Sequence, residues 1–203
     1  MSNNRREFIK KGALLIAATP LIGMNGCSKD KEINKCTTSD DILGPYYRES
    51  APFRADLNVN NQLGTLLTLS GTVYGVDCET PLSEAIIDVW HADHTGDYDN
   101  SSADYAFRGK INTDSNGRYE FITIVPGQYL LGGGSDYRPG HIHFKITASN
   151  HNDLVTQLYF AGDPFISSDP WASQEDAAER TVTLAVDSNG NKTGIFNIRL
   201  TPS

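Results

Sequence analysis

The sequence predicts an all-β domain, an antiparallel β-sandwich with little helix. Apolar residues alternate with polar ones over short segments, which is the pattern of half-buried strands. Glycine and proline, 18 and 9 of the 203 residues, separate these segments as turns. No segment has a long helical period, and a chain of 203 residues is within the size of one β-rich domain.

The first expected strands follow from local composition. Over residues 67–73, Leu, Gly and Val alternate with Thr and Ser, which predicts a half-buried strand. Residues 85–90 (AIIDVW) are apolar and β-branched, as is typical of strands. The turn residues 114–117 (DSNG) precede an alternation of Tyr, Phe and Thr over 119–123, which predicts the next strand.

Four more strands are expected in the second half of the chain. They cover residues 141–147 (HIHFKIT), 154–160 (LVTQLYF), 181–186 (TVTLAV) and 194–200 (GIFNIRL). Residues 172–180 (ASQEDAAER) are compatible with one short helix. Short strands without a long helix favour the antiparallel sandwich.

Composition and charge exclude several classes of function. The chain has 17 Lys and Arg against 25 Asp and Glu, a formal net charge of -8, and no basic run in its body. Nucleic acid is therefore not expected as a partner. None of the three Cys belongs to a CxxC pair, which argues against a structural zinc site or a thiol-redox motif. No apolar run approaches the ~20 residues of a transmembrane helix.

Residues 1–26 have the features of an export signal. A charged start with Arg5 and Arg6 precedes a short apolar stretch and is similar to a twin-arginine signal, with a general secretory signal as the alternative. The sequence before Cys27 is similar to a lipoprotein cleavage site, with ordinary signal-peptide cleavage as the alternative. We expect an exported bacterial protein, either periplasmic or a lipoprotein of the cell envelope whose lipid anchors it to a membrane.

Behind the signal, residues 27–42 are polar and are expected to form a tether, followed by the sandwich domain at 43–203. If Cys27 is lipidated, Cys36 and Cys78 remain as a pair in an oxidising compartment. A disulfide between them is favoured over two buried thiols. It would pin the irregular N-terminal segment to the core.

Two histidines on one expected strand indicate a metal site. Successive side chains of a strand alternate between faces. One face therefore carries Ile142, Phe144 and Ile146, and the other carries His141 and His143. Two rises of ~3.3 Å place the histidine Cα atoms roughly 6.6 Å apart, a spacing from which two imidazoles can converge on one ion. Two solvent-facing histidines are the alternative.

Further ligands have to come from elsewhere, because this strand has no Asp, Glu or third His. His91 and His94 could supply nitrogen, but they are expected at the edge of a pocket or in solvent, and His151 lies in a polar turn, where it is expected to be solvated. Tyr98 and Tyr129 each lie in a loop beside Gly, after an expected strand. Either tyrosine alone is equally typical of simple packing.

Several motifs together resemble the intradiol ring-cleavage dioxygenases. They are WHAD at 90–93 with Tyr98, TD at 113–114 with Gly117 and Tyr119, Pro126 with Tyr129, RPGHIHF at 138–144, TQLYFAGDP at 156–164 and, near the N-terminus, GPYY at 44–47. Their order along residues 36–200 argues against a chance match. Residues 130–137 form a Gly-rich loop where protocatechuate-type members have a Trp-containing one, so the shape of the pocket does not follow from the resemblance.

The resemblance implies a mononuclear Fe(III) whose protein ligands are Tyr98, Tyr129, His141 and His143. Phenolate is a hard anionic donor that suits ferric iron, and imidazole suits iron generally. The resemblance also implies the activity. A catechol-type aromatic binds as a dianion, displaces the side chain of Tyr129, and is cleaved by O2 to a muconate-type diacid.

Four further residues match family positions beside the metal. Arg138 and Gln157, together with Tyr129, are implied to be catalytic. A fixed cation beside a ring that gains electron density provides preorganised electrostatic stabilisation. Tyr46 and Pro45 are implied to line the substrate pocket. The alternatives are an ordinary surface position for Arg138 and a cross-strand hydrogen bond for Gln157.

A second interpretation stays open at this point. Residues 71–73, 81–85 and 113–121 are also similar to exported prealbumin-like or carboxypeptidase-regulatory-like sandwiches, which are binding modules without metal. Both kinds of protein share the prealbumin-like fold, so the fold does not separate them. A binding module has no need for two Tyr and two His together with Arg138, which favours the enzyme. The sequence does not predict the oligomeric state.

Overall fold

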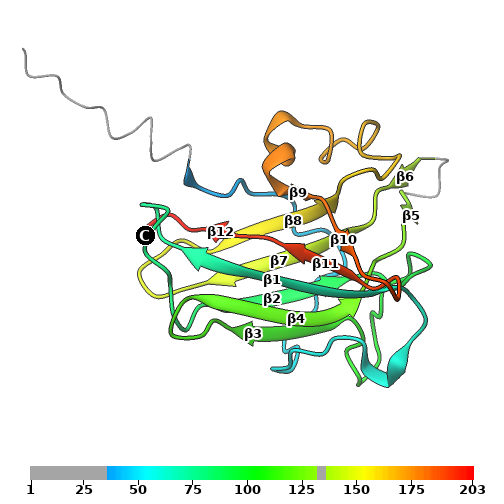
Figure 1. Cartoon of the computed structure of the whole chain (residues 1–203), viewed down its shortest axis with the longest axis horizontal. Coiled ribbons are helices and arrows are strands. Elements are labelled where there is room, and N and C mark those ends of the chain that lie inside the picture. Colours follow the sequence, from blue (N-terminus) through cyan, green and yellow to red (C-terminus); the bar gives the residue numbers. More distant parts are fainter. Residues whose placement is uncertain (1–35, 132–135) are drawn as a thin grey trace, which may run out of the picture.

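The structure, a computed structural model, describes residues 36–131 and 136–203. Two β-sheets and a short two-stranded ribbon make up the domain (Figure 1). The predicted export signal at 1–26 and the predicted lipidation site, Cys27, lie outside the described residues. Within the described ranges, no helix has the length and apolar character that crossing a membrane requires.

The first sheet has the strand order β10-β11-β1-β12, and β4 also pairs with β1. Its strands are β1 (Leu66–Tyr74), β4 (Arg118–Ile124), β10 (Ala185–Val186), β11 (Lys192–Ile195) and β12 (Ile198–Arg199).

The second sheet has the order β3-β2-β7-β8-β9. Its strands are β2 (Ile86–His91), β3 (Arg108–Asn112), β7 (His141–Thr147), β8 (Leu154–Phe160) and β9 (Thr181–Val182). The remaining elements are the ribbon strands β5 (Tyr129–Leu130) and β6 (Tyr137–Arg138), and the 3-10 helices η1 (Val59–Asn61) and η2 (Glu175–Arg180).

The predicted all-β sandwich is confirmed, and β7 and β8 have the expected bounds. Two differences concern the C-terminal half. The helix expected over 172–180 is the shorter 3-10 helix η2, and the segment 181–186 is divided between β9 and β10. The pairs β1–β11, β1–β12 and β8–β9 are parallel, because long connections rather than hairpins bring these strands together.

The expected strand at 194–200 is divided between β11 and β12 at Phe196, which is buried in the core. Its backbone N–H donates to Ser70 O (2.8 Å), and its carbonyl accepts a hydrogen bond from Tyr119 Oη (2.5 Å). Gly71 permits this approach, since a Cβ there would collide with the Phe196 carbonyl. The strand is therefore interrupted at Phe196, whose backbone groups hydrogen bond to Ser70 and Tyr119.

The core fills the space between the two sheets, and the alternation predicted for β7 is confirmed. Ile142, Phe144 and Ile146 are fully buried there. The Phe144 ring lies 6.2 Å from that of Phe121 and 5.3 Å from that of Phe196, centroid to centroid. Burying each such side chain stabilises the fold by ~1.5–3 kcal/mol.

Residues 36–47, which we call the N-terminal strap, pass β12 and β8 and continue onto the side of the second sheet that faces away from the core. The backbone N–H of Asp41 donates to Val155 O (2.9 Å). The carbonyl of Ile42 accepts from Gln157 Nε2 (2.8 Å). The strap is therefore bound to the sheet by hydrogen bonds at successive residues.

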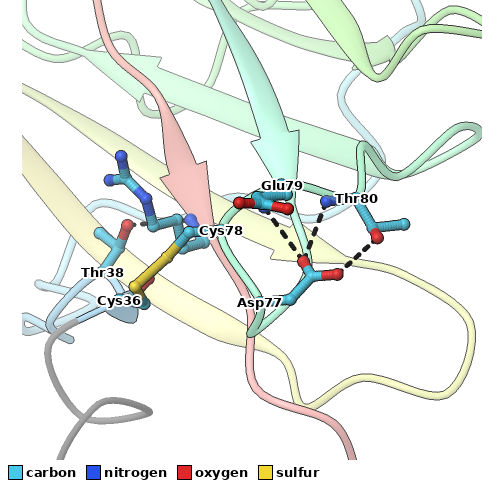
Figure 2. The surroundings of a disulfide bond; sticks show 7 residues. Cys36, Thr38, Asp77, Cys78, Glu79 and Thr80 are labelled. Atoms are coloured by element: carbon cyan, nitrogen blue, oxygen red, sulfur yellow. Dashed lines mark hydrogen bonds between the residues drawn. A yellow bond between two sulfur atoms is a disulfide. The ribbon is translucent and has the colours of Figure 1, made fainter.

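A disulfide joins Cys36 to Cys78, whose Cα atoms are 5.8 Å apart (Figure 2). It connects the start of the strap to the turn after β1. Thr38 N also donates to a backbone oxygen of β12 (3.1 Å). The predicted tether at 27–42 is thus too long: residues 36–42 are fixed against the domain, because their polar groups bond to β8 and β12.

Candidate metal centre

The candidate site lies on the face of the second sheet that points away from the core. Trp90, His143 and Gln157 are register partners across β2, β7 and β8. His141 is the partner of Tyr159 in the adjacent row. Paired residues project from the same face of a sheet, so these side chains lie together beneath the N-terminal strap.

The two histidines predicted as ligands converge. Their Nε2 atoms are 3.2 Å apart, and both side chains are buried. His141 Nδ1 is 2.7 Å from Pro139 O, which fixes the proton on Nδ1 and leaves Nε2 as a free lone pair. Burial, followed by the charge of Arg138, lowers the pKa of His141 to about 3, so this imidazole is neutral at physiological pH.

Tyr98 brings an oxygen to the same point from the loop after β2. Its hydroxyl is 3.1 Å from His143 Nε2 and 3.4 Å from His141 Nε2. Three donor atoms from three residues therefore lie within 3.4 Å of one another. The predicted association of Tyr98 with the histidine pair is present in the structure.

Tyr129 reaches the cluster from the two-stranded ribbon, where it is the register partner of Arg138. Its ring lies 5.6 Å from the His141 ring and 5.7 Å from the Tyr98 ring. Its hydroxyl is 3.5 Å from Arg138 Nη1. The structure thus gathers all four predicted ligands at one place, from β5, β7 and the loop after β2.

The chemistry of this donor set fits a ferric ion. Two neutral imidazoles meet two phenols, and the described ranges hold no cluster of three or more His, Cys, Asp or Glu that would suit another metal site. Burial, and next the neighbouring Tyr129, raises the pKa of Tyr98. A phenolate there consequently requires a cation close by, and a metal ion held by the lone pairs of His141 and His143 would provide it.

Arg138 is a buried cation, not a surface arginine. Its Nε donates to Asp169 Oδ2 (2.7 Å) and its Nη2 to Gln157 Oε1 (3.1 Å). Its Nη1 is 3.5 Å from Tyr129 Oη and 3.5 Å from His141 Nε2. Burial is the largest single effect and acts to lower the pKa of Arg138, but the interactions with Asp169 and Tyr129 together outweigh it. The pKa is therefore raised and the guanidinium stays charged.

Gln157 connects Arg138 to the N-terminal strap. Its Oε1 accepts from Arg138, while its Nε2 donates to Ile42 O (2.8 Å). The side chain is fully buried. Its amide is therefore fixed in orientation, with the oxygen directed at the guanidinium.

The strap also places one aromatic residue, Tyr46, over the site. Tyr46 stacks on Tyr98, with centroids 4.2 Å apart and an interplanar angle of 18°. It meets Tyr129 edge-on at 6.0 Å. Arg108 Nη1 donates to the Tyr46 carbonyl (2.7 Å), which holds this part of the strap down. Pro45 is exposed beside Tyr46.

The other histidines lie apart from this cluster. His91, expected at a pocket edge or in solvent, is fully buried. Its Nε2 is 2.6 Å from Thr123 Oγ1 of β4, and its Nδ1 is 2.6 Å from Ala92 O. It projects between the sheets because it alternates with Trp90 along β2. His94 is exposed.

No sequence pattern marks Asp169, although its carboxylate is the partner of Arg138. It lies in the irregular segment after β8, where neither strand nor helix periodicity marks it. The chain has 25 acidic residues, so composition does not single it out. The neighbouring Trp171, whose ring lies 4.4 Å from Arg138 Cζ, is unmarked for the same reason.

Comparison with protein families shows what this arrangement resembles. A family model described as "Dioxygenase" matches residues 42–202. Catechol 1,2-dioxygenase 2 of Acinetobacter lwoffii is 33% identical over 174 residues, which cover 77% of this chain and 63% of that protein. Chlorocatechol 1,2-dioxygenase of Rhodococcus opacus is 34% identical, over 65% of this chain and 60% of that protein. The chain thus spans less than two thirds of either relative.

Solved structures of dioxygenases share the fold. The dioxygenase domain of a dioxygenase and carbohydrate-binding protein fusion from Streptomyces sp. SirexAA-E has a TM-score of 0.71 and 34% identity, and covers 82% of this chain and 99% of that one. The 3-chlorocatechol 1,2-dioxygenase of Rhodococcus opacus 1CP has a TM-score of 0.74 and 26% identity, over 86% of this chain and 78% of that one. These relatives favour an enzyme over a metal-free binding module.

Proposed function

This chain belongs to the intradiol ring-cleavage dioxygenase family, and we propose that it cleaves a catechol-type aromatic between its two hydroxyl-bearing carbons with the help of Fe(III). Both atoms of O2 enter the product, a muconate-type diacid. The atoms balance without an external reductant, because the ring bond that breaks supplies the electrons.

One observation carries the proposal. Tyr98 Oη and the Nε2 atoms of His141 and His143 converge within 3.4 Å, with Tyr129 beside them. These three atoms are electron-pair donors that are buried at one point, and a cation bound between them would accept all three. A binding module gains nothing from such a cluster.

The proposed iron ligands are Tyr98, Tyr129, His141 and His143. A bound ferric ion would act as a Lewis acid that withdraws electron density from the catechol oxygens and makes the ring reactive toward O2. Tyr129 Oη, held 3.5 Å from Arg138 Nη1, is placed to accept a proton from an incoming catechol hydroxyl. Its position on a ribbon outside the sheet would let it move aside when substrate enters.

Arg138 supplies a fixed positive charge next to the reacting ring. Gln157 and Asp169 hold the guanidinium on two sides, so little reorganisation is needed as charge develops in the transition state. Tyr46, stacked on Tyr98, forms part of the cover that would exclude water and contact the ring. Pro45 shapes the strap beside it.

The decisive experiment is oxygen uptake by iron-loaded protein with catechol, chlorocatechol, hydroxyquinol and protocatechuate, with products identified by mass. We expect a red to burgundy protein with tyrosinate-to-iron charge-transfer absorption, and a diacid product containing both oxygen atoms of 18O2. Iron-loaded protein that consumes no O2 with any of these compounds, or that yields a semialdehyde, would overturn the proposal.

We also propose that the protein is exported, on the basis of residues 1–26 and Cys27. Replacing Arg5 and Arg6 by Lys should leave folded precursor in the cytoplasm if the twin-arginine route is used. Labelled palmitate should be incorporated in the native sequence and lost in Cys27→Ala. Unchanged export in the first variant, or labelling that survives in the second, would contradict these assignments.

A further inference from the structure

Arg138 and Asp169 form an ion pair that is removed from solvent. Arg138 Nε is 2.7 Å from Asp169 Oδ2 and Nη2 is 3.3 Å from Oδ1, so one edge of the guanidinium faces the carboxylate with two N–H groups. Both side chains are 1% exposed. Among the described residues, Asp169 is the only carboxylate within ion-pair distance of Arg138. A buried charge needs such a partner, and a two-point contact fixes its orientation.

The remaining contacts of Arg138 are weaker or neutral. Its Nη2 lies 3.1 Å from the Gln157 amide oxygen and 3.3 Å from Tyr159 Oη. Its Nη1 has only the long contacts, 3.5 Å, to Tyr129 and His141. The edge that faces the metal cluster is thus the least restrained, and its direction depends on the edge that Asp169 holds.

Asp169 is itself held rigidly. Its Oδ1 accepts hydrogen bonds from the backbone N–H groups of Trp171 (3.0 Å) and Ala172 (2.8 Å). The indole of Trp171 covers the guanidinium at 4.4 Å from Cζ, a cation-π distance. The turn at 169–172 therefore holds Arg138 by charge on one edge and by an aromatic surface on one face.

We propose that Asp169 is a positioning residue for the reaction, acting through Arg138, so this inference rests on the proposed function. It orients the guanidinium so that Nη1 points at Tyr129 Oη and His141 Nε2, where catechol would bind. Asp169 has no contact with either tyrosine ligand among the hydrogen bonds of the described residues. Its effect on turnover must therefore pass through Arg138.

Asp169→Asn separates this role from the structural one. The Asn carbonyl can still accept from Trp171 and Ala172, while its NH2 group would oppose the Arg138 N–H groups. We expect iron content and charge-transfer colour to be kept, KM for catechol to change little, and kcat to fall on the order of 10²-fold, as for a misplaced catalytic group. Asp88→Asn is the matched control, since Asp88 is also buried on this sheet but lies away from Arg138. It should retain kcat.

A double-mutant cycle tests the route of the effect. If Asp169 acts only through Arg138, Arg138→Ala/Asp169→Asn should be no slower than Arg138→Ala alone. If the rate losses of the two single substitutions multiplied in the double variant, or if Asp169→Asn kept the full kcat, the inference would be overturned. So would an equal loss of kcat in Asp88→Asn, because a general loss of packing would then explain both.

NMR of the metal-free protein without any substitution tests the Arg138–Asp169 contact directly. It needs neither enzymatic activity nor a correctly folded variant. The Arg138 Nε–H should give a resolved, slowly exchanging NMR signal with a coupling across the hydrogen bond to the Asp169 carboxylate. An averaged, rapidly exchanging signal would overturn the inference even in an active enzyme. If the signal is present but no catechol is turned over, the proposed function fails while the positioning contact stands.

Discussion

Gly44 packs its backbone against the imidazole of His143: a Cβ at Gly44 would lie 3.1 Å from His143 Cε1. Its φ of +72° also lies in the left-handed region that glycine adopts readily. The strap therefore approaches the metal cluster more closely than a residue with a side chain could.

Gly44→Ala should accordingly disturb the site itself. We expect displacement of the strap, weaker iron binding and a kcat lowered by roughly 10-fold, because small displacements of catalytic groups are costly. Iron content by elemental analysis and kcat by oxygen uptake measure this. Gly190→Ala is the control, with a similar φ of +83° but nothing within 4 Å of its Cβ. Equal effects of the two substitutions would show that backbone strain alone is responsible.

The sequence predicts the parts of the site that follow from period-two alternation. His141 and His143 lie on the outer face of β7 because Ile142 and Phe144 fill the core, and this pattern is visible in the residues alone. Tyr98 and Tyr129 carry no such signal, since each lies in or beside a loop. They were placed by resemblance of their surrounding motifs to a family.

Other features depend on contacts that no local pattern encodes. Asp169 meets Arg138 across 31 residues of chain, and Asp41 of the strap meets Arg180 across 139. The strand β3 (RGKIN) has a single large apolar residue, Ile111, and is a strand because β2 pairs with it. Tertiary pairing overrides weak local propensity at such places.

Tyr98→Phe and Tyr129→Phe should differ, although both remove one phenol from the cluster. Tyr98 Oη lies within 3.4 Å of both histidine Nε2 atoms, so its loss should strip most of the iron and visible absorption. Tyr129 Oη contacts Arg138 at the margin of the cluster, so Tyr129→Phe should keep some iron, shift the absorption band and slow turnover. Visible spectra at matched iron loading test this. Identical spectra and rates would contradict distinct roles.

His91 should make the metal-free domain sensitive to mild acid. Burial lowers its pKa to about 4 in the folded protein, against ~6.5 in the unfolded chain. Folding therefore favours the neutral ring. The contribution of His91 to the free energy of unfolding is fully present above pH 6.5 and is lost as the pH falls toward 4. The loss at pH 4 amounts to about 3 kcal/mol.

Urea unfolding of the metal-free protein between pH 7 and 4 measures this, with His91→Gln for comparison. The variant lacks the titrating ring but can still hydrogen bond to Thr123. It should be less stable at pH 7, and the difference from wild type should shrink as the pH falls. A difference that stays constant over this range would show that His91 does not titrate as its burial implies.

The Cys36–Cys78 disulfide should stabilise the domain without being needed for the metal cluster. The bond closes a loop with a sequence separation of 42 residues. In the chain-entropy model, losing such a loop costs about 4 kcal/mol of unfolding free energy. The strap nevertheless keeps the buried ion pair between Asp41 and Arg180 (2.5 Å) and the hydrogen bond from Gln157 to Ile42. We therefore expect Cys36→Ser/Cys78→Ser to unfold at lower denaturant concentration while retaining iron, colour and most of kcat below its melting range.

Mass spectrometry of the unreduced native protein should show the linked peptides, and free thiols at both positions would contradict the pairing. If the double variant instead lost its iron while still folded, the strap would depend on the covalent link and not on its hydrogen bonds.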